Sequence, residues 1–145
     1  MKSKRILFIC TGNTCRSPMA ELILKEKLKN AGIKGIRVTS AGLMAEDKQK
    51  MSRHSFEALK LLGIVNYNFR SKRVTHDLLT KSDLIICMTK HHVEYLRGFD
   101  NVCSIGEITG QKDISDPYGG LLSDYIRTSH EIEDACNEII RKLTE

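Results

Sequence analysis

The feature that most constrains the fold of this chain is the alternation of short apolar runs with segments of helical periodicity. Residues 5–10 (RILFIC) and 83–88 (DLIICM) are almost entirely apolar over the length of a single strand. Such runs are typical of strands buried on both faces, because a strand with one solvent-exposed face alternates apolar and polar residues. Segments of helical spacing separate the runs, as in strand–helix–strand units. We therefore predict an α/β fold in which a parallel sheet lies between helices on both faces.

The remaining elements follow from the same periodicity. A helix is predicted from Ser17, as its N-cap, to Gly32 at its C-terminal end. Gly106–Gly120 is predicted as a loop, and Phe56 is placed on the apolar face of a helix over 52–62. The other predicted elements are strands at 36–40 and 101–105, a short helix at 90–97 and a long terminal helix.

Composition agrees with a single domain over residues 1–145. A chain of 145 residues that is 41% hydrophobic and 28% charged can bury a core without cross-links. The 23 Lys and Arg exceed the 18 Asp and Glu by five, and these charges are scattered along the chain. The excess favours anionic ligands, but without a basic stripe it gives no reason to expect a nucleic-acid partner.

Two further features bear on location and on the cysteines. No apolar run reaches the roughly 18 residues of a membrane span, so no membrane partner is expected. The apolar run after the basic N-terminus is too short for a secretory signal, so we expect a cytoplasmic, reducing environment. The five cysteines then form no disulfide framework. Cys87, Cys103 and Cys136 lie in apolar stripes and are predicted to pack in the core.

The segment from Cys10 to Ser17 contains the strongest chemical signal. Cys10 ends the first predicted strand and Arg16 opens the first helix, so the two are joined by a C-x5-R loop. Such a loop wraps its backbone N–H groups around one centre and aims a helix N-terminus at it, which makes an anion site. Gly12 and Asn13 tolerate the left-handed backbone that a tight loop needs. The predicted binding residues for phosphate or another tetrahedral oxyanion are Thr11, Gly12, Asn13, Thr14, Cys15, Arg16 and Ser17.

The side chains of this loop suggest nucleophilic chemistry as well as binding. The planar fork of Arg16 suits two oxygens of a tetrahedral anion. Cys10, at the floor of a positive field, is a candidate thiolate nucleophile, with the Ser17 hydroxyl as a donor to its sulfur. The alternative is a structural cysteine followed by a chance arginine. Walker-type and dinucleotide-binding loops are excluded because their glycine and lysine patterns are absent.

A resemblance to a known family covers about residues 4–143. The run from Cys10 to Glu21 (CTGNTCRSPMAE) and the segment Asp116-Pro117-Tyr118-Gly119 resemble the signature and the general-acid loop of the low-molecular-weight protein tyrosine phosphatases. The resemblance implies a four-stranded parallel sheet, phosphomonoester hydrolysis and a phosphorylated protein as the partner. It implies that Cys10 is the nucleophile, that Arg16 binds phosphate, and that Asp116 is the acid and then the base.

Chemistry supports the role of Asp116 independently. When a thiolate displaces an alkoxide, phenolate or amine, the leaving group needs a proton donor. The alternative for an isolated aspartate is a turn residue, and the cysteine loop makes the catalytic interpretation preferable. Tyr118 next to it is predicted to form an aromatic rim that contacts the substrate side chain, the alternative being a half-buried loop anchor.

Other candidate sites are weaker. The cysteine that matches Cys15 in the resembled family can form a reversible disulfide with the nucleophile, and packing is the alternative role. No second Cys or His pair has zinc-ligand spacing, so no metal and no cofactor is expected. His91 and His92 are predicted to lie on an exposed helix start, and the remaining histidines on the surface: His54, His76 and His130.

The substrate preference is indicated by departures from the tyrosine-phosphatase pattern. The segment 43–51 contains no aromatic residue, and Phe69 stands where a histidine is usual. Thr11 and the Met88–His91 segment look more like the bacterial protein arginine phosphatase branch. A threonine next to the nucleophile places a hydroxyl near the guanidinium of a phosphoarginine. We therefore expect Thr11 to bias the pocket toward phosphoarginine over phosphotyrosine.

Two other functions remain as alternatives. A thioredoxin-linked arsenate reductase shares the cysteine loop but relays electrons through two further cysteines after the third strand, where Cys87 has no partner within ten residues. A non-catalytic oxyanion-sensing module would need neither Cys10 nor Asp116. The sequence therefore favours a cysteine-dependent protein phosphatase.

Overall fold

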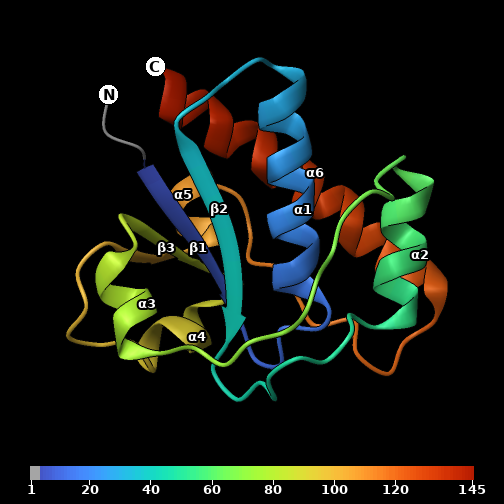
Figure 1. Ribbon diagram of the computed structural model, residues 1–145, viewed down its shortest axis with the longest axis horizontal. Helices are drawn as coiled ribbons and strands as arrows, with labels where there is room; N and C mark the ends of the chain where they lie inside the picture. Colours follow the sequence, from blue (N-terminus) through green and yellow to red (C-terminus); the bar gives the residue numbers. More distant parts are fainter. Residues whose placement is uncertain (1–3) are drawn as a thin grey trace.

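The four parallel strands form one sheet in the order β2-β1-β3-β4 (Figure 1). The computed structural model describes residues 4–145. The strands are β1 (Lys4–Cys10), β2 (Ile36–Gly42), β3 (Leu84–Cys87) and β4 (Val102–Ser104). Cys10 pairs with Gly42 on one side of β1, and Ile9 pairs with Cys87 on the other. The predicted four-stranded parallel sheet is therefore confirmed.

Helices cover both faces of this sheet, as predicted (Figure 1). Helices α1 (Arg16–Asn30), α2 (Arg53–Leu61) and α6 (Leu122–Thr144) lie on one side. Their apolar residues share a core with Ile6 and Phe8 of β1. Helices α3 (His76–Lys81) and α4 (Lys90–Glu94) lie on the other side, where Leu7 and Ile9 point. Both faces of β1 are thus buried, which explains its continuously apolar sequence. No helix within residues 4–145 is long and apolar enough to cross a membrane.

The prediction of a loop over Gly106–Gly120 is wrong for its first part, which is helix α5 (Ile105–Thr109). This helix begins with a capping box, in which the Ser104 hydroxyl accepts from Glu107 N–H and the Glu107 carboxylate accepts from Ser104 N–H. It ends after one turn because Gly110 adopts a left-handed backbone with φ 71°. The Ser-x-x-Glu spacing was the available sequence signal for this helix.

The prediction of Ser17 as the N-cap of the first helix is also wrong. Helix α1 begins at Arg16, and the cap position is occupied by Cys15, whose side chain makes no capping hydrogen bond. Ser17 is therefore inside the first turn, where its buried hydroxyl is directed to Cys10. A helix whose first N–H groups lack a side-chain cap leaves them available to an anion.

The carboxyl ends of β1 and β2 meet tightly at the edge of the sheet that bears the loop. A Cβ atom on Gly42, at the end of β2, would lie 2.6 Å from the carbonyl oxygen of Thr11 and 2.9 Å from the backbone nitrogen of Asn13. Only glycine allows this approach. The loop is therefore packed against backbone rather than suspended in solvent, and this positions the candidate site.

Candidate functional site

The loop between β1 and α1 lines a hollow of about 220 Å³ at the carboxyl edge of the sheet. Asp116 and Tyr118 reach the same hollow from the segment that precedes α6. Every predicted site residue lines the hollow except Asn13 and Ser17, which are fully buried. The lining consists of Cys10, Thr11, Gly12, Thr14, Cys15, Arg16, Asp116 and Tyr118.

Asn13 holds the loop in its shape. It adopts a left-handed backbone, with φ 54°, and is fully buried. Its side-chain amide donates to the hydroxyls of Ser17 and Ser40, each at 2.9 Å, and its oxygen accepts from Lys72 N–H at 2.9 Å. Three hydrogen bonds to three segments thus stabilise a conformation that few residue types adopt. Of the two residues expected to tolerate a left-handed backbone, Asn13 adopts it and Gly12 does not.

A buried carboxylate supports Asn13 from behind. The Ser40 hydroxyl donates to Glu21 Oε1 at 2.6 Å, and Lys25 donates to Glu21 Oε2 at 2.7 Å. The chain of contacts from Asn13 through Ser40 to Glu21 ties the loop to β2 and to α1. A fully satisfied polar network of this kind fixes one arrangement of its members. Sequence reasoning assigned no role to Glu21 or Ser40, because only the fold brings them next to Asn13.

The Cys10 sulfur is placed to act as a thiolate. It is 2.9 Å from the Ser17 hydroxyl and almost completely buried. Since Asn13 donates to that hydroxyl, Ser17 keeps its own proton to donate to the sulfur. A hydrogen bond donated to sulfur favours the charged form. The backbone N–H groups of residues 12–15 have no acceptor among residues 4–145, so they are available to an anion bound by the loop.

Arg16 and Asp116 meet across the hollow. Arg16 is 5% exposed, and its Nη1 donates to the carbonyl oxygen of Ile114 at 3.1 Å. Its Nη2 lies 3.6 Å from Asp116 Oδ2. The Asp116 side chain is about half exposed, and its other oxygen accepts from Tyr118 N–H at 3.0 Å. Tyr118 is 80% exposed, so it stands at the rim and is not a half-buried anchor.

Cys15 lines the hollow, and its sulfur contacts residues of two other segments. Its buried sulfur is 3.5 Å from the Ser52 hydroxyl and 3.7 Å from the Tyr125 hydroxyl. Burial and the Cys15 contact raise the pKa of Tyr125 to about 12, so the phenol stays protonated. All five cysteines are free. Neither Cys10 nor Cys15 is therefore in a disulfide in this structure.

The prediction that His92 lies on an exposed helix start is wrong. His92 is 3% exposed, and its Nε2 lies 3.0 Å from the Thr11 hydroxyl. Its Nδ1 accepts from Thr89 N–H at 3.2 Å, which leaves the proton on Nε2, so Nε2–H donates to Thr11. Burial, followed by the charge of Arg16, lowers the pKa of His92 to about 4, so the ring is neutral at pH 7. The Thr89-x-x-His92 spacing of a capped helix start was the only sequence signal.

The other histidines and cysteines lie away from this hollow. His76, His91 and His130 are exposed, and His54 packs edge-to-face on Tyr125 at 5.1 Å. The predicted core positions are confirmed for Cys87 and Cys136, whose thiol pKa values burial raises to about 12, while Cys103 is half-buried. Within residues 4–145, no three His, Cys, Asp or Glu side chains are grouped as metal ligands.

Sequence comparison places this site among known proteins. Residues 5–145 match the family described as low molecular weight phosphotyrosine protein phosphatase. The protein-arginine-phosphatase of Bacillus subtilis is 36% identical over 145 residues, which is 95% of each chain. The low molecular weight protein-tyrosine-phosphatase PtpB of Staphylococcus haemolyticus is 38% identical over 136 residues, 88% of this chain and 91% of its own.

Structural comparison agrees. The crystal structure of a YwlE mutant from Bacillus subtilis superposes with a TM-score of 0.90 at 35% identity, over 99% of this chain and 100% of the other. A YwlE arginine phosphatase mutant with a phosphorylated active-site serine gives a TM-score of 0.89 at 34% identity, over 97% of this chain and 96% of the other. With this sheet, this loop and a family match over residues 5–145, the chain belongs to the low molecular weight phosphotyrosine protein phosphatase family of hydrolases.

Proposed function

We propose that this chain removes phosphate from phosphorylated proteins, with Cys10, Arg16 and Asp116 as its catalytic residues. The observation that carries the proposal is their convergence in one hollow of about 220 Å³, next to loop N–H groups that have no acceptor within residues 4–145. The protein itself supplies a nucleophile, an anion clamp and a proton donor. We therefore expect the reaction to need no cofactor.

In the first step, Cys10 Sγ attacks phosphorus and a sulfur–phosphorus bond forms. The bond from phosphorus to the leaving atom breaks, and protonated Asp116 gives its proton to that atom. Arg16 and the loop N–H groups bind the three non-bridging oxygens, on which charge is concentrated during transfer. The distance of 3.6 Å from Asp116 Oδ2 to Arg16 Nη2 supports this role for Asp116.

In the second step, water releases the phosphate. The Asp116 carboxylate takes a proton from the attacking water, the sulfur–phosphorus bond breaks, and the Cys10 thiolate is regenerated. The Ser17 hydroxyl at 2.9 Å stabilises the thiolate as a leaving group. Inorganic phosphate then leaves the site, and Asp116 is protonated for the next turnover.

Phosphoarginine is the substrate we favour over phosphotyrosine. Because His92 Nε2–H donates to the Thr11 hydroxyl, one lone pair of that oxygen remains for a guanidinium N–H of the substrate. A desolvated guanidinium needs such acceptors. The matched protein-arginine-phosphatase supports this preference, whereas the matched PtpB is named as a tyrosine phosphatase. Tyr118 at the rim would contact the substrate side chain in either case.

The alternative functions are less well supported. The deep burial of Cys87 and its high pKa make it a poor electron relay, which disfavours an arsenate reductase. An oxyanion sensor would not need a proton donor next to the arginine.

A redox role for Cys15 with Cys10 remains part of the proposal. It predicts that Cys15→Ser recovers less activity than the parent after mild peroxide followed by a thiol reductant. Equal recovery would exclude the disulfide.

A steady-state assay tests the proposal. Purified protein, treated with a metal chelator, should hydrolyse an aryl phosphate and a phosphoarginine peptide. Cys10→Ser should lose at least about 10²-fold in kcat/KM, the contribution of one catalytic group, while it still binds an oxyanion such as vanadate or phosphate. Retained turnover in Cys10→Ser would reject covalent catalysis by this residue.

A further inference from the structure

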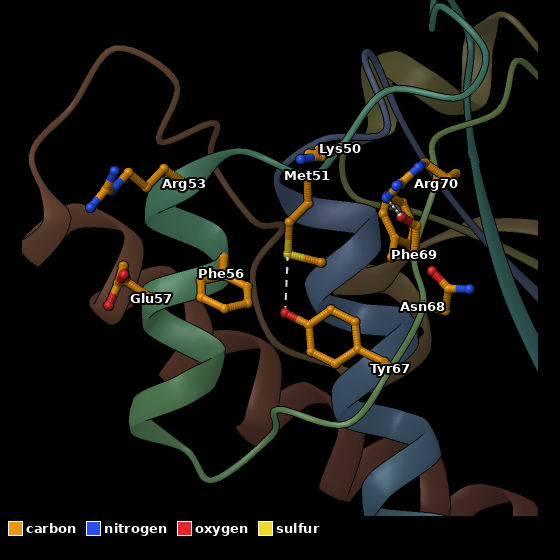
Figure 2. Close-up of a pocket in the computed structure, with 9 residues that line it drawn as sticks. All are labelled: Lys50, Met51, Arg53, Phe56, Glu57, Tyr67, Asn68, Phe69 and Arg70. Carbon is orange, nitrogen blue, oxygen red and sulfur yellow. Dashed lines mark hydrogen bonds between the residues drawn. The ribbon is translucent and has the colours of Figure 1, made fainter.

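A second and larger hollow, of about 470 Å³, lies between α2 and the segment 67–70 (Figure 2). Its apolar lining is formed by Met51, Phe56, Tyr67 and Phe69. None of these residues lines the catalytic hollow. Phe56, which was predicted to be on the apolar face of its helix, is 41% exposed, so this aromatic surface is open to a partner. We call this site the α2 hollow.

The walls of the α2 hollow are held in place. The Tyr67 hydroxyl donates to the Met51 sulfur at 3.6 Å, and Figure 2 shows this contact across the hollow. The rings of Phe56 and Tyr67 lie edge to face at a centroid distance of 6.5 Å. Phe69 is 8% exposed and anchors the segment. A preformed space lined by aromatic rings and a thioether suits an apolar side chain of a ligand.

The rim of the α2 hollow is positively charged. Lys50, Arg53 and Arg70 border it, against a single acid, Glu57. None of the three cations forms an ion pair within residues 4–145. Arg70 donates only to the carbonyl oxygen of Phe69. Unpaired cations around an apolar centre complement a ligand that carries acidic groups next to an apolar group.

The α2 hollow is continuous with the catalytic loop through Ser52. This residue stands between Met51 and Arg53, which both line the hollow. Its N–H donates to the carbonyl oxygen of Thr14 at 2.9 Å, and the Cys15 sulfur lies 3.5 Å from its hydroxyl. One wall of the hollow is therefore bonded directly to the loop that binds phosphate. The rim therefore lies next to the loop at which a phosphorylated polypeptide would be presented.

We propose that the α2 hollow docks an acidic segment of the phosphoprotein substrate, with an aromatic or aliphatic side chain of that segment packed against Phe56 and Tyr67. The inference rests on the proposed function, because the segment belongs to the same protein that presents the phosphate. Docking adds affinity for protein and peptide substrates and adds nothing for a small aryl phosphate, which cannot reach the hollow.

The test compares charge reversal at the rim with a matched reversal elsewhere. The variant Arg53→Glu/Arg70→Glu changes two exposed cations of the rim. Arg37→Glu, on the exposed part of β2 and away from its carboxyl end, is the control. The substrates are a phosphoarginine peptide with an acidic-aromatic cluster on either side of the phosphorylated residue, the same peptide with Gln and Asn in place of Glu and Asp, and an aryl phosphate.

We expect the double variant to lower kcat/KM for the acidic peptide at least tenfold, mainly through KM. The aryl phosphate and the neutral peptide should change less than twofold, as should all substrates with Arg37→Glu. Phe56→Ser should reproduce part of the loss on the acidic peptide. Equal losses on the aryl phosphate would show that the substitutions disturb the catalytic loop, and this would overturn docking.

Binding separates failure of docking from failure of the proposed function. Fluorescence anisotropy of the unphosphorylated acidic-aromatic peptide should show binding to the parent and weaker binding to the double variant, whether or not any phosphate is hydrolysed. Identical binding by parent and double variant would overturn the proposal. So would a parent dimer that dissociates on charge reversal, because a second copy of the chain would then be the occupant.

Discussion

The phosphate-binding loop and the segment that contains Asp116 line the same hollow but are built differently. In the loop, Asn13 and Ser17 are fully buried, and hydrogen bonds tie Asn13 to α1, to β2 and to Lys72. In the acid segment, Asp116 is about half exposed and Tyr118 is 80% exposed. Its contacts are mostly local, such as the bond from Tyr118 N–H to Asp116.

This difference matches what each region has to recognise. The three oxygens of a phosphoryl group have the same geometry in every substrate, so a rigid, cross-braced loop can fit them in advance. Leaving groups differ in size and shape, and the proton donor has to approach all of them. A segment held by few long-range contacts at the rim suits that task. Substitutions in the loop should therefore affect every substrate, and substitutions in the acid segment only those that need a proton.

The largest effect should come from the loop. Arg16→Lys replaces a planar fork with a point charge and loses the donor to the carbonyl oxygen of Ile114. We expect kcat/KM to fall roughly 10²–10³-fold, by the same factor for aryl phosphates with good and with poor leaving groups. A steady-state series with phenols of graded acidity measures this. A loss of kcat/KM confined to substrates with poor leaving groups would show that Arg16 assists the leaving group, as Asp116 does. The predicted difference between the two regions would then be wrong.

The acid segment should give the opposite pattern. Asp116→Asn keeps the acceptor for Tyr118 N–H but supplies no proton. For a poor leaving group we expect a loss in kcat/KM of about 10²-fold or more, within the range of one general acid, and a much smaller loss for an activated aryl phosphate. For Asp116→Asn, a plot of log kcat/KM against the pKa of the leaving phenol should have a steeper slope than for the parent. If both substrates lose equally, Asp116 has a structural role.

Thr11 lines the hollow together with Asp116 and Tyr118. A substitution of Thr11 should therefore change the selectivity between substrates. Thr11→Ile removes the hydroxyl that accepts from His92 and offers an apolar wall instead. The ratio of kcat/KM for phosphoarginine and phosphotyrosine peptides should fall tenfold or more, about 1.4 kcal/mol of differential transition-state binding. Thr11→Ser, which keeps the hydroxyl, is the matched control. An unchanged ratio in Thr11→Ile would place selectivity elsewhere.

The smallest effect concerns His92 and stability. Because its pKa is lowered to about 4, the unfolded chain binds a proton below pH 6.5 that the folded chain does not. The contribution of His92 to the free energy of unfolding is therefore fully present above pH 6.5 and is lost as the pH falls toward 4. His92→Gln keeps a donor to Thr11 but does not titrate. We expect urea unfolding to show the parent losing roughly 1–2 kcal/mol more than this variant between pH 7 and pH 5. Parallel losses would mean that His92 titrates normally.

The sequence was sufficient to predict what depends on neighbours along the chain. The apolar run of β1, the loop from Cys10 to Arg16 and the position of Asp116 are local signals, and the structure brings these residues together. The N-cap of α1 was misplaced by two residues, because the cap rule for Ser17 ignored the competing bond to the Cys10 sulfur.

Features that depend on long-range contacts could not be predicted. His92 is buried only because α4 packs where Thr11 leaves β1, 81 positions away in sequence. Glu21 and Ser40 support Asn13 only after α1 and β2 are side by side. The α2 hollow likewise forms between Phe56 and the segment that contains Tyr67. The periodicity of α2 indicates its apolar face but not which segment lies opposite that face.

The central claim is that phosphate passes through Cys10, and trapping the intermediate tests it most directly. In Asp116→Asn, an activated aryl phosphate still loads the enzyme, while the water step is slowed because its base is missing. Rapid quenching and mass spectrometry of the digested protein should then find one phosphate per chain on the peptide that contains Cys10, and none in Cys10→Ala/Asp116→Asn. Phosphate on a different residue, or the same loading after Cys10 is replaced, would contradict the account.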